Sequence, residues 1–430
     1  MSTAGSIPAD PPAGRSGTWV GSLAIGLLLA AEVHAQVEWR RSPLNPLVPF
    51  ATTGGYAMDP VVIRDEAAGV YRMWYTAYSG TWQIHLALST DGIHWFTYVG
   101  NPVLSAGSAP FESGGVSYAG VVREGSGYRM LYTGVQGGYN TAIGTATSPD
   151  GIEWTRYPGN PVLSTEGSGW DSQRIETAHA LLRDDIGFRV YYTGYDGVRH
   201  QTGLATSVDG VHWTKHPENP VLPAGAPGAW DDADTETRGA IFVDGTTLLF
   251  YTAQAPGSQR AAIGIARSLD GVHFERLPAN PVLTGGGPAS WDWTIRGGCP
   301  TLEGTSLHLW YAGTPRDAAE WSIGLATTSA ALLGVEEPGT PRPESVMLAP
   351  GRPNPMRAQV SFEYTLAKPE HVRFEILDVL GRRLASLVDE EQNAGRHACE
   401  WRAPGVANGV YIARLSAGPV VRMRKLAVVR

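Results

Sequence analysis

The 430-residue chain has little cysteine, little charge and a shortage of basic residues, and each of these excludes a class of protein. Its two cysteines, Cys299 and Cys399, fall in segments that we expect to form different domains, which argues against a disulfide framework and a cysteine-based metal site. Charged residues make up only 17% of a chain that is 43% hydrophobic, so wholesale disorder is excluded. The formal net charge of -8 makes nucleic acid and polyanionic glycans poor partners.

Long apolar runs are lacking too. The run over residues 20–31 is too short to span a bilayer. Arg15 precedes it and the small-residue sequence VHA at 33–35 follows it, a pattern that predicts an export signal over residues 1–35. A buried N-terminal helix is the alternative, but the run has neither caps nor an amphipathic period. We therefore expect a mature chain without a transmembrane span, either secreted or held at the cell surface.

What the chain has instead is a repeat. The stretch STDGIHWFTYVGNPVLS, which begins at Ser89, recurs in variant form from Ser148, Ser207 and Ser268. The Asn-Pro pair near its end marks five units, with spacings of 56, 59, 59 and 61 residues between Asn45, Asn101, Asn160, Asn219 and Asn280. A nearly fixed period of this length indicates a fold built from one repeated supersecondary unit.

Each unit predicts four short antiparallel strands. Aromatic and β-branched runs such as YRMWYTA, from Tyr71, have no helical period. We interpret the Asp-Gly pair that begins at Asp91, and its equivalents, as a two-residue hairpin turn before the fourth strand. Trp39 stands six residues before Asn45, as the equivalent aromatic residues do in later units, so an N-terminal strand should complete the last unit. These features predict an all-β chain with a five-bladed β-propeller over residues 36–333.

The remaining residues predict a linker and a second domain. Residues 334–350 are rich in proline and lack a period, which is typical of a linker. Residues 351–430 contain several strand-like runs separated by glycine and proline, which suits a small Ig-like β-sandwich. Its segments PNPMRAQVSFEYTL, VRFEILDVLGRRLASLVD and NGVYIARL resemble, in order, the C-terminal sorting domains of the type IX secretion system and the related flagellar hook-capping module. The resemblance implies export, with the outer-membrane secretion machinery as a partner, although the basic stretch 422–430 equally suits a plain solvated edge strand.

One recurrent acidic feature is expected to be structural. Pairs of an aromatic and an acidic residue precede the first strand of four units, as Phe111-Glu112, Trp170-Asp171, Trp230-Asp231 and Trp291-Asp292. Because a residue needed in every blade is needed by the blade, we expect these pairs to anchor the blades. The acidic run of Asp231, Asp232, Asp234 and Glu236 offers the oxygen ligands that Ca²⁺ takes but lacks the EF-hand spacing. We expect no resident metal or cofactor, with Ca²⁺ at that run as the alternative.

Function should lie where the units differ, and the first strand of each unit lines the channel of a propeller. Aligned on their apolar ends, these strands put Asp59 alone at one level and Glu176, Glu236 and Arg296 together at another. Cleavage of a glycosidic bond needs one ionised carboxylate and one protonated carboxylic acid, held in environments that separate their pKa values. We expect burial and the neighbouring Glu236 to raise the pKa of Glu176, and contact with water or an arginine to keep Asp59 ionised.

Two motifs in these strands carry a resemblance. MDP, which contains Asp59, and IETAH, which contains Glu176, resemble motifs of the five-bladed glycoside hydrolases of families 43, 32 and 68. The resemblance implies Asp59 as base or nucleophile and Glu176 as general acid. The chain departs from these families in its second unit, where SYAG has no carboxylate in place of the expected third acidic residue and Glu112 is the candidate to reach in. The plain alternatives are a turn-capping role for Asp59 and an ion pair of Glu176 with Arg238 or Arg296.

The remaining channel residues are expected to contact a glycan. They are Tyr118, His179, Glu236, Arg238, Trp293 and Arg296, with Trp82 as a further aromatic platform. The leading hypothesis is a secreted glycoside hydrolase acting on neutral plant-type or microbial oligo- or polysaccharides. A non-catalytic glycan-binding propeller is the alternative, and the missing carboxylate of the second unit favours it. A third reading, a glycoside phosphorylase of the mannoside type, needs basic residues such as Arg238 and Arg296 to hold phosphate.

Overall fold

The computed structural model describes residues 38–333, except 54, 67, 138, 185 and 256, and residues 346–429, except 379–381 and 419. The predicted export signal and most of the predicted linker lie outside the described residues. No helix in these ranges is long and apolar enough to cross a membrane.

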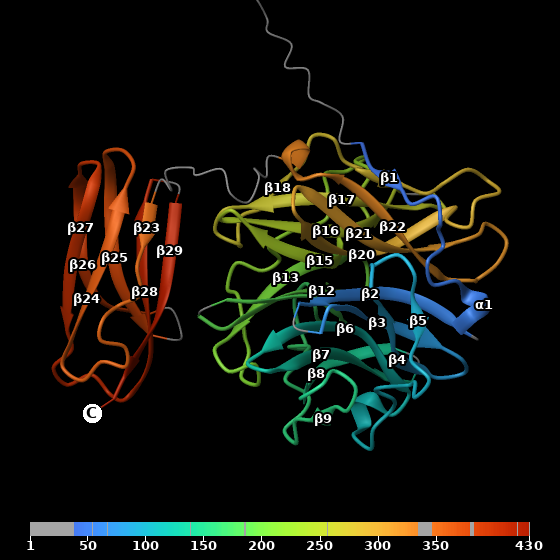
Figure 1. Cartoon of the computed structure of the whole chain (residues 1–430), viewed down its shortest axis with the longest axis horizontal. Coiled ribbons are helices and arrows are strands. Elements are labelled where there is room, and N and C mark those ends of the chain that lie inside the picture. The colour runs from blue at the N-terminus through green and yellow to red at the C-terminus, as the bar shows by residue number, and fades with distance from the viewer. Residues whose placement is uncertain are drawn as a thin grey trace, which may run out of the picture. The chain divides into compact units, whose positions relative to one another are not determined.

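The described residues up to 333 form the propeller, in which each sequence unit supplies an antiparallel blade (Figure 1). Blade 1 consists of β2 (Tyr56–Asp65), β3 (Val70–Tyr78), β4 (Trp82–Ser89) and β5 (Phe96–Thr97). Blade 2 consists of β6 (Gly115–Glu124), β7 (Gly127–Gln136), β8 (Tyr139–Ser148) and β9 (Thr155–Arg156). Blade 3 consists of β11 (Arg174–Arg183), β12 (Phe188–Tyr195), β13 (His200–Ser207) and β14 (Thr214–Lys215). Blade 4 consists of β15 (Glu236–Val243), β16 (Thr246–Gln254), β17 (Ala261–Ser268) and β18 (Glu275–Arg276).

Blade 5 closes the ring with a strand from the other end of the domain, as the sequence predicts. Its chain-order strands are β20 (Thr294–Glu303), β21 (Ser306–Thr314) and β22 (Ser322–Ser329). The N-terminal β1 (Arg40–Arg41) pairs with β22 as the fourth strand, and Figure 1 shows the two side by side. The innermost strands β2 and β20 are also in contact. Joining the two ends of the domain in one blade covers the edges that an open arrangement would leave exposed.

Short elements lie in the loops. They are α1 (Phe50–Thr53), η1 (Pro110–Glu112), β10 (Leu163–Ser164), β19 (Leu283–Thr284) and η2 (Ala330–Leu333). β10 and β19 pair with the third strands of blades 2 and 4. The second strand of each blade is mostly buried, because the neighbouring blades cover both of its faces. Trp74 of β3, for example, is fully buried, and its Nε1 donates to the Gly151 carbonyl of the next blade at 2.8 Å.

The repeated asparagine fastens each loop to a third strand. Asn101 Oδ1 accepts the Leu86 N–H at 2.7 Å, and its Nδ2 donates to the Leu86 carbonyl at 2.9 Å. The same two bonds join Asn45 to Leu325, Asn160 to Thr145, Asn219 to Leu204 and Asn280 to Ile265. A side chain that satisfies a backbone donor and acceptor in every blade is structural.

The Asp-Gly pairs do not form two-residue hairpin turns, so that interpretation is wrong. Leu88 pairs with Phe96, and residues 90–95 connect the third and fourth strands. Asp91 Oδ1 accepts the N–H groups two and three residues ahead at 2.9 and 2.8 Å, and Gly92 takes the positive φ of 74°. The aspartate therefore stabilises a longer loop through its own side chain, which is the other way in which this residue type forms turns.

The aromatic–acidic pairs anchor the blades, as predicted. Asp171 accepts the Tyr192 hydroxyl at 3.1 Å and pairs with Lys215 at 2.7 Å. Trp170 packs on Tyr192 with a centroid distance of 5.4 Å, and a Cβ on Gly194 would come within 2.4 Å of its ring. The equivalent groups are Asp231 with Tyr251 and Arg276, and Asp292 with Tyr311 and the Arg41 of β1.

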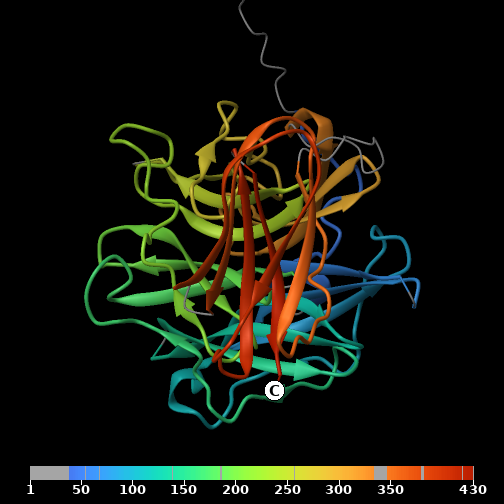
Figure 2. The ribbon, with the colours of Figure 1, turned by 90° about the vertical axis from the view of Figure 1, so that its left-hand side faces the viewer.

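Residues 346–429 form a separate β-sandwich of two sheets. One sheet contains β23 (Val346–Leu348), β24 (Gln359–Leu366) and β27 (Gly395–Arg402), and the other contains β25 (Glu370–Asp378), β26 (Arg383–Gln392), β28 (Gly409–Ala417) and β29 (Val420–Val428). Figure 2 shows these orange and red strands lengthwise. Phe362 and Phe374, one from each sheet, are fully buried with ring centroids 5.0 Å apart. The two cysteines lie in different domains and are free, in line with the prediction.

Candidate functional site

The innermost strands β2, β6, β11, β15 and β20 line the channel, and each loses register with its neighbour at about the same height. The irregularities lie between Met58 and Val61, Ser117 and Gly120, Glu176 and Ala180, Thr237 and Gly239, and Arg296 and Cys299. A bulge re-aims side chains that would otherwise alternate between the two faces of a strand. The five bulges therefore gather unlike side chains from all five blades at one height of the channel.

Backbone strain accompanies three of these bulges. Asp59, Tyr118 and Thr177 have φ values of 53°, 50° and 47°, whereas blade 5 places Gly297 at the corresponding point with φ of 75°. Left-handed backbone is unfavourable for a residue with a Cβ, by roughly 1 kcal/mol or more. Strain of this kind clusters at functional sites, so the bulges mark this height of the channel as a candidate site.

Arg238 joins carboxylates from two blades. Its side chain is 1% exposed, and its Nη1 lies 3.2 Å from Asp59 Oδ1 while its Nη2 is ion-paired with Glu236. Its guanidinium carbon lies 5.1 Å from the centroid of the Tyr118 ring. Glu176 of the adjacent blade is close enough for its charge to be coupled to those of Glu236 and Arg238. We call Asp59, Glu176 and Glu236, with Arg238 among them, the carboxyl cluster.

The surroundings of the three carboxyl groups drive their pKa values apart. Burial raises the pKa of Asp59 to about 6, against the opposing effect of Arg238 and Arg296. Burial, together with the charge of Glu236, also raises the pKa of Glu176 above its ordinary value. For Glu236 burial acts in the same direction, but the two arginines outweigh it and lower the pKa to about 2. The cluster therefore combines two carboxyl groups that hold a proton more readily than usual with one firmly ionised carboxylate.

Access to the three groups is unequal. The side chain of Asp59 is 0% exposed, that of Glu176 is 10% exposed and that of Glu236 is 16% exposed. Asp59 Oδ2 is buried, and none of the described residues supplies it with a hydrogen-bond partner. Of the two environments expected to keep Asp59 ionised, the structure supplies the arginine and not the water. Asp59 is thus the deepest member of the cluster, and the glutamates are the members that a ligand reaches first.

Tyr118 and His179 pack around Asp59. The Nε2 of His179 donates to the Asp59 carbonyl at 3.0 Å, and its ring meets Tyr118 edge-on with a centroid distance of 5.6 Å. Burial lowers the pKa of His179 to about 3, so the ring is neutral, and burial raises the pKa of Tyr118 to about 12. His179 is 6% exposed and supports the Asp59 backbone, whereas Tyr118 is partly exposed and open to contact with a ligand.

Two predicted contributors lie away from the cluster. Glu112 is buried and ion-paired with Arg156 at 3.1 Å, so it anchors blade 2 and does not supply the missing carboxylate. Trp293 precedes β20 and lies between two arginines, Arg260 and Arg316, at 5.7 and 5.9 Å from its ring. Trp293 is therefore a residue of the channel rim rather than of its interior.

A strip of aromatic and cationic side chains, Tyr139, Arg174, Tyr195 and His200, borders the cluster, and no sequence motif marked it. Arg174 Nη1 lies 3.2 Å from Glu176 Oε1, and its guanidinium carbon lies 4.3 Å from the Tyr195 ring and 5.6 Å from the Tyr139 ring. Tyr195 in turn stacks on His200 at 4.4 Å. Arg174 begins the first strand of blade 3, Tyr195 ends the second and His200 begins the third. In an antiparallel blade these three positions lie at the same end, so this strip lies at one mouth of the channel.

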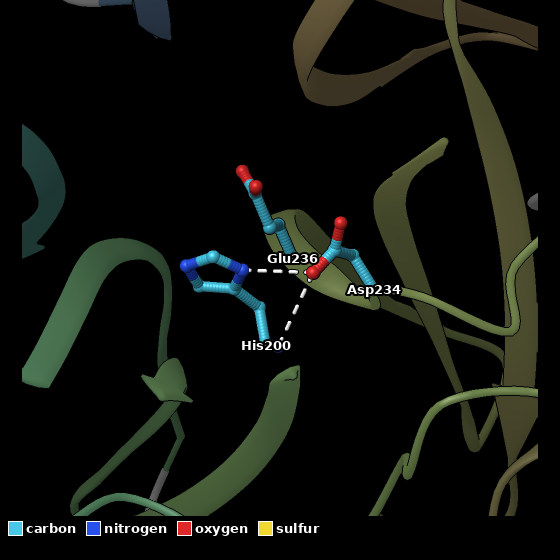
Figure 3. A group of neighbouring side chains, drawn as sticks. All are labelled: His200, Asp234 and Glu236. Atoms are coloured by element: carbon cyan, nitrogen blue, oxygen red, sulfur yellow. Dashed lines mark hydrogen bonds and ion pairs between the residues drawn. The ribbon is translucent and has the colours of Figure 1, made fainter. Parts of the chain in front are cut away.

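His200, Asp234 and Glu236 offer potential metal-ligand atoms that all lie within 4.8 Å of one another (Figure 3). His200 Nδ1 is hydrogen-bonded to Asp234 at 2.8 Å, and Glu236 is ion-paired with Arg238. Because these atoms already engage one another or a cation, the group does not by itself point to a metal. The acidic run considered for Ca²⁺ is not assembled as a set of ligands, since Asp231 belongs to the blade anchor described above.

Comparisons of sequence give little coverage. No family model matches the chain. Two uncharacterized proteins of Mycobacterium tuberculosis, from strains H37Rv and CDC 1551, are each 31% identical over 182 residues, which cover 40% of this chain and only 58% of theirs. A probable sucrose-6-phosphate hydrolase of Psychromonas ingrahamii is 38% identical over 88 residues, which cover 19% of this chain and 15% of that protein.

Solved structures match most of the propeller. A putative glycosidase of Bacteroides thetaiotaomicron has a TM-score of 0.53 and 20% identity, over 69% of this chain and 97% of that one. A member of the GH130 family, which contains mannoside phosphorylases and glycoside hydrolases, has a TM-score of 0.53 and 18% identity over 69% and 95%. A β-1,2-mannobiose phosphorylase of Listeria innocua has a TM-score of 0.53 and 14% identity over 69% and 98%. The chain therefore shares its propeller fold with glycosidases and glycoside phosphorylases.

Proposed function

We propose that the protein is an exported glycoside hydrolase that cleaves neutral oligo- or polysaccharides at the channel mouth beside the carboxyl cluster. The observation that carries the proposal is the convergence of carboxyl groups from three blades around one buried arginine, with pKa values driven in opposite directions. Glycosidic cleavage requires one carboxyl group that holds a proton and one that is ionised. Burial favours the protonated form of Glu176, whereas Arg238 and Arg296 oppose the effect of burial on Asp59, whose pKa of about 6 leaves it ionised at neutral pH. The fold shared with solved glycosidases supports the same conclusion.

Glu176 suits the role of general acid. Its pKa is raised, its side chain is within reach of a ligand, and Arg174 holds its Oε1 at 3.2 Å. Asp59 suits the ionised partner, since a pKa of about 6 leaves it ionised at neutral pH and close to the value at which a base is most effective. Because its side chain is fully covered, this role requires substrate binding to uncover it. Glu236 stays ionised and holds Arg238 in place.

A non-catalytic glycan-binding propeller is the second candidate. The complete burial of Asp59 favours it, because a carboxylate that never meets substrate cannot serve as a base. A phosphorylase has weaker support. Both terminal nitrogens of Arg238 already face carboxylates, which leaves Arg296, stacked on Trp321 at 5.8 Å, as the channel arginine with capacity for phosphate.

The test is sugar release from arabinan, xylan, fructan and mannan oligosaccharides, with and without inorganic phosphate. We expect release without phosphate by the unmodified protein, and a loss of about 100-fold or more in Asp59→Asn and Glu176→Gln. Glu176→Gln should retain most activity on dinitrophenyl glycosides, because their leaving group needs no proton. Glu275→Gln, at an exposed pair on the outer edge of blade 4, is the matched control and should remain fully active.

The other outcomes separate the candidates. Release only when phosphate is present would identify a phosphorylase. Binding of an oligosaccharide without release by any form of the protein would identify the binding module and overturn the hydrolase.

A further inference from the structure

The backbone fixes the position of His200 between two blades. His200 begins β13 and forms a parallel bridge with Asp234, just before β15. The Thr235 N–H donates to the His200 carbonyl at 2.9 Å, and Thr202 Oγ1 donates to the Thr235 carbonyl at 2.6 Å. The imidazole is therefore held at the boundary of blades 3 and 4 by main-chain bonds.

The two ring nitrogens of His200 differ in their contacts with the described residues. Its Nδ1 lies 2.8 Å from Asp234 Oδ1, and because an ionised carboxylate only accepts, Nδ1 carries the hydrogen. Tyr195 stacks on the ring at 4.4 Å and 23°, which fixes its plane. Figure 3 shows Nε2 on the side of the ring turned away from Asp234, and no described residue supplies it with a hydrogen-bond partner. When an aspartate accepts a hydrogen bond from one ring nitrogen of a histidine, it sets the tautomer and the orientation of the ring, so the other nitrogen faces a ligand in a defined protonation state.

The charged groups that act most strongly on His200 come from neighbouring segments of blades 3 and 4. They are Asp234 from the segment before β15, Glu236 from β15 and Glu176 from β11. Burial lowers the pKa of His200, but the Asp234 hydrogen bond and the charges of the two glutamates outweigh burial, and the net shift is upward. The imidazole thus lies close enough to the two accessible carboxyl groups of the cluster for their charges to act on it.

We propose that His200 is a substrate-contacting residue of the same site, with Nε2 hydrogen-bonded to a hydroxyl group of the sugar that lies against Glu176 and Glu236, and that Asp234 positions the ring. The inference rests on the proposed function in taking the ligand to be a glycan. A hydroxyl group both donates and accepts, so it pairs with Nε2 in either protonation state.

The blades differ at this rim position. Trp82 of blade 1 and Trp321 of blade 5 occupy the position that His200 has in blade 3. Each of the three stands two residues before the third-strand residue that pairs with an equivalent position of the second strand: Ile84 with Thr76, Thr202 with Thr193, and Ile323 with Ala312. Two aromatic platforms and one polar contact around one mouth provide both a stacking surface and a point of orientation for a sugar. The polar contact therefore gives blade 3 a specificity role that blades 1 and 5 do not have.

The test compares His200→Ala, His200→Gln and Asp234→Asn with the matched control His212→Gln. His212 also pairs its Nδ1 with an aspartate, Asp209, at 2.7 Å, but it is exposed on the outer loop of blade 3. We expect His200→Ala to raise KM and weaken oligosaccharide binding roughly tenfold, with a smaller change in kcat. His200→Gln, whose amide reaches the position of Nε2, should recover most of the binding, and His212→Gln should bind as the unmodified protein does.

Binding of the oligosaccharide that gives the strongest heat in the same panel is measured by calorimetry, so the comparison does not depend on turnover. An unchanged Kd and KM in His200→Ala would overturn the role of His200 while leaving the hydrolase intact. Binding without turnover that weakens in His200→Ala would support His200 and remove the hydrolase. A complete lack of glycan binding would remove both.

A second readout follows the ring itself. In ¹⁵N-histidine spectra we expect a hydrogen on the Nδ1 of His200, and a shift of the Nε2 signal when the oligosaccharide is added. If CaCl₂, ZnCl₂ or MnCl₂ at stoichiometric concentration shifts both nitrogen signals instead, the group of Figure 3 is a metal site and the substrate role is wrong.

Discussion

Replacement of Asp59 by asparagine should stabilise the protein at neutral pH and at the same time abolish glycan cleavage. The substitution keeps the shape of the side chain, and the amide oxygen can still accept from Arg238, which lies 3.2 Å from Oδ1. Only the charge is removed. A buried carboxylate that is needed for function but lowers the free energy of unfolding produces a trade-off between stability and activity.

The magnitude follows from the pKa of Asp59. Burial raises it from 3.8 to about 6, a shift of about 2 units that corresponds to roughly 3 kcal/mol at 1.36 kcal/mol per unit. The folded state binds this proton more tightly than the unfolded state does. The stability that the fold gains from this proton is therefore fully present below about pH 4 and is lost as the pH rises through about 6. Because asparagine does not titrate, the stability of Asp59→Asn does not include this loss.

The assay is urea unfolding followed by tryptophan fluorescence at several pH values. The stability advantage of Asp59→Asn should grow from near zero at about pH 4 to as much as roughly 3 kcal/mol at about pH 7. Asp209→Asn is the control without a slope in this pH range: burial works to raise the pKa of Asp209, but hydrogen bonds from His212 and from backbone N–H groups hold it well below its usual range, so this carboxylate is ionised in the folded and the unfolded protein above about pH 4. That variant should be less stable than the unmodified protein by a nearly constant amount between about pH 4 and pH 7. An advantage of Asp59→Asn that does not vary with pH would show that burial does not raise the pKa of Asp59.

Three further variants test the packing that holds the site. Arg238→Met leaves buried Asp59 and partly buried Glu236 without their cation and should cost about 3–5 kcal/mol in urea unfolding, whereas Arg267→Met, at an exposed pair of the same blade, should cost under about 1 kcal/mol. Trp74→Ala should cost about 3–5 kcal/mol by the same measurement, because a fully buried ring and a bond between blades are lost. Arg41→Met removes the cation from buried Asp292 and should cost about 1–3 kcal/mol, with faster proteolysis near the N-terminal strand; equal proteolysis would contradict closure by β1.

The repeat made the propeller predictable because every blade needs the same asparagine and the same buried strand. Ring closure was also readable, since Trp39 keeps its spacing to Asn45. The turn after each third strand was misread because Asp91 has two ways to form a turn, through positive φ or through its own carboxylate, and residue identity alone does not choose between them.

The site was only partly readable for a different reason. The levels of Asp59 and Glu176 follow from strand register, which the sequence pattern carries. The burial of Asp59 does not, because Arg238, 179 residues away, covers it only once the ring has closed. The sequence indicates His200 only weakly, because the residue type at the start of the third strand changes between units. Its role becomes visible only when the fold brings it beside Asp234.

A crystal structure of the Glu176→Gln variant with a bound oligosaccharide from the release panel is the most direct test of cleavage beside the carboxyl cluster. We predict a sugar at the mouth formed by blades 3 and 4, with the glycosidic oxygen about 3 Å from the residue 176 amide. An oligosaccharide bound instead on the outer blade edges or on the C-terminal sandwich, with the carboxyl cluster still covered, would contradict this prediction.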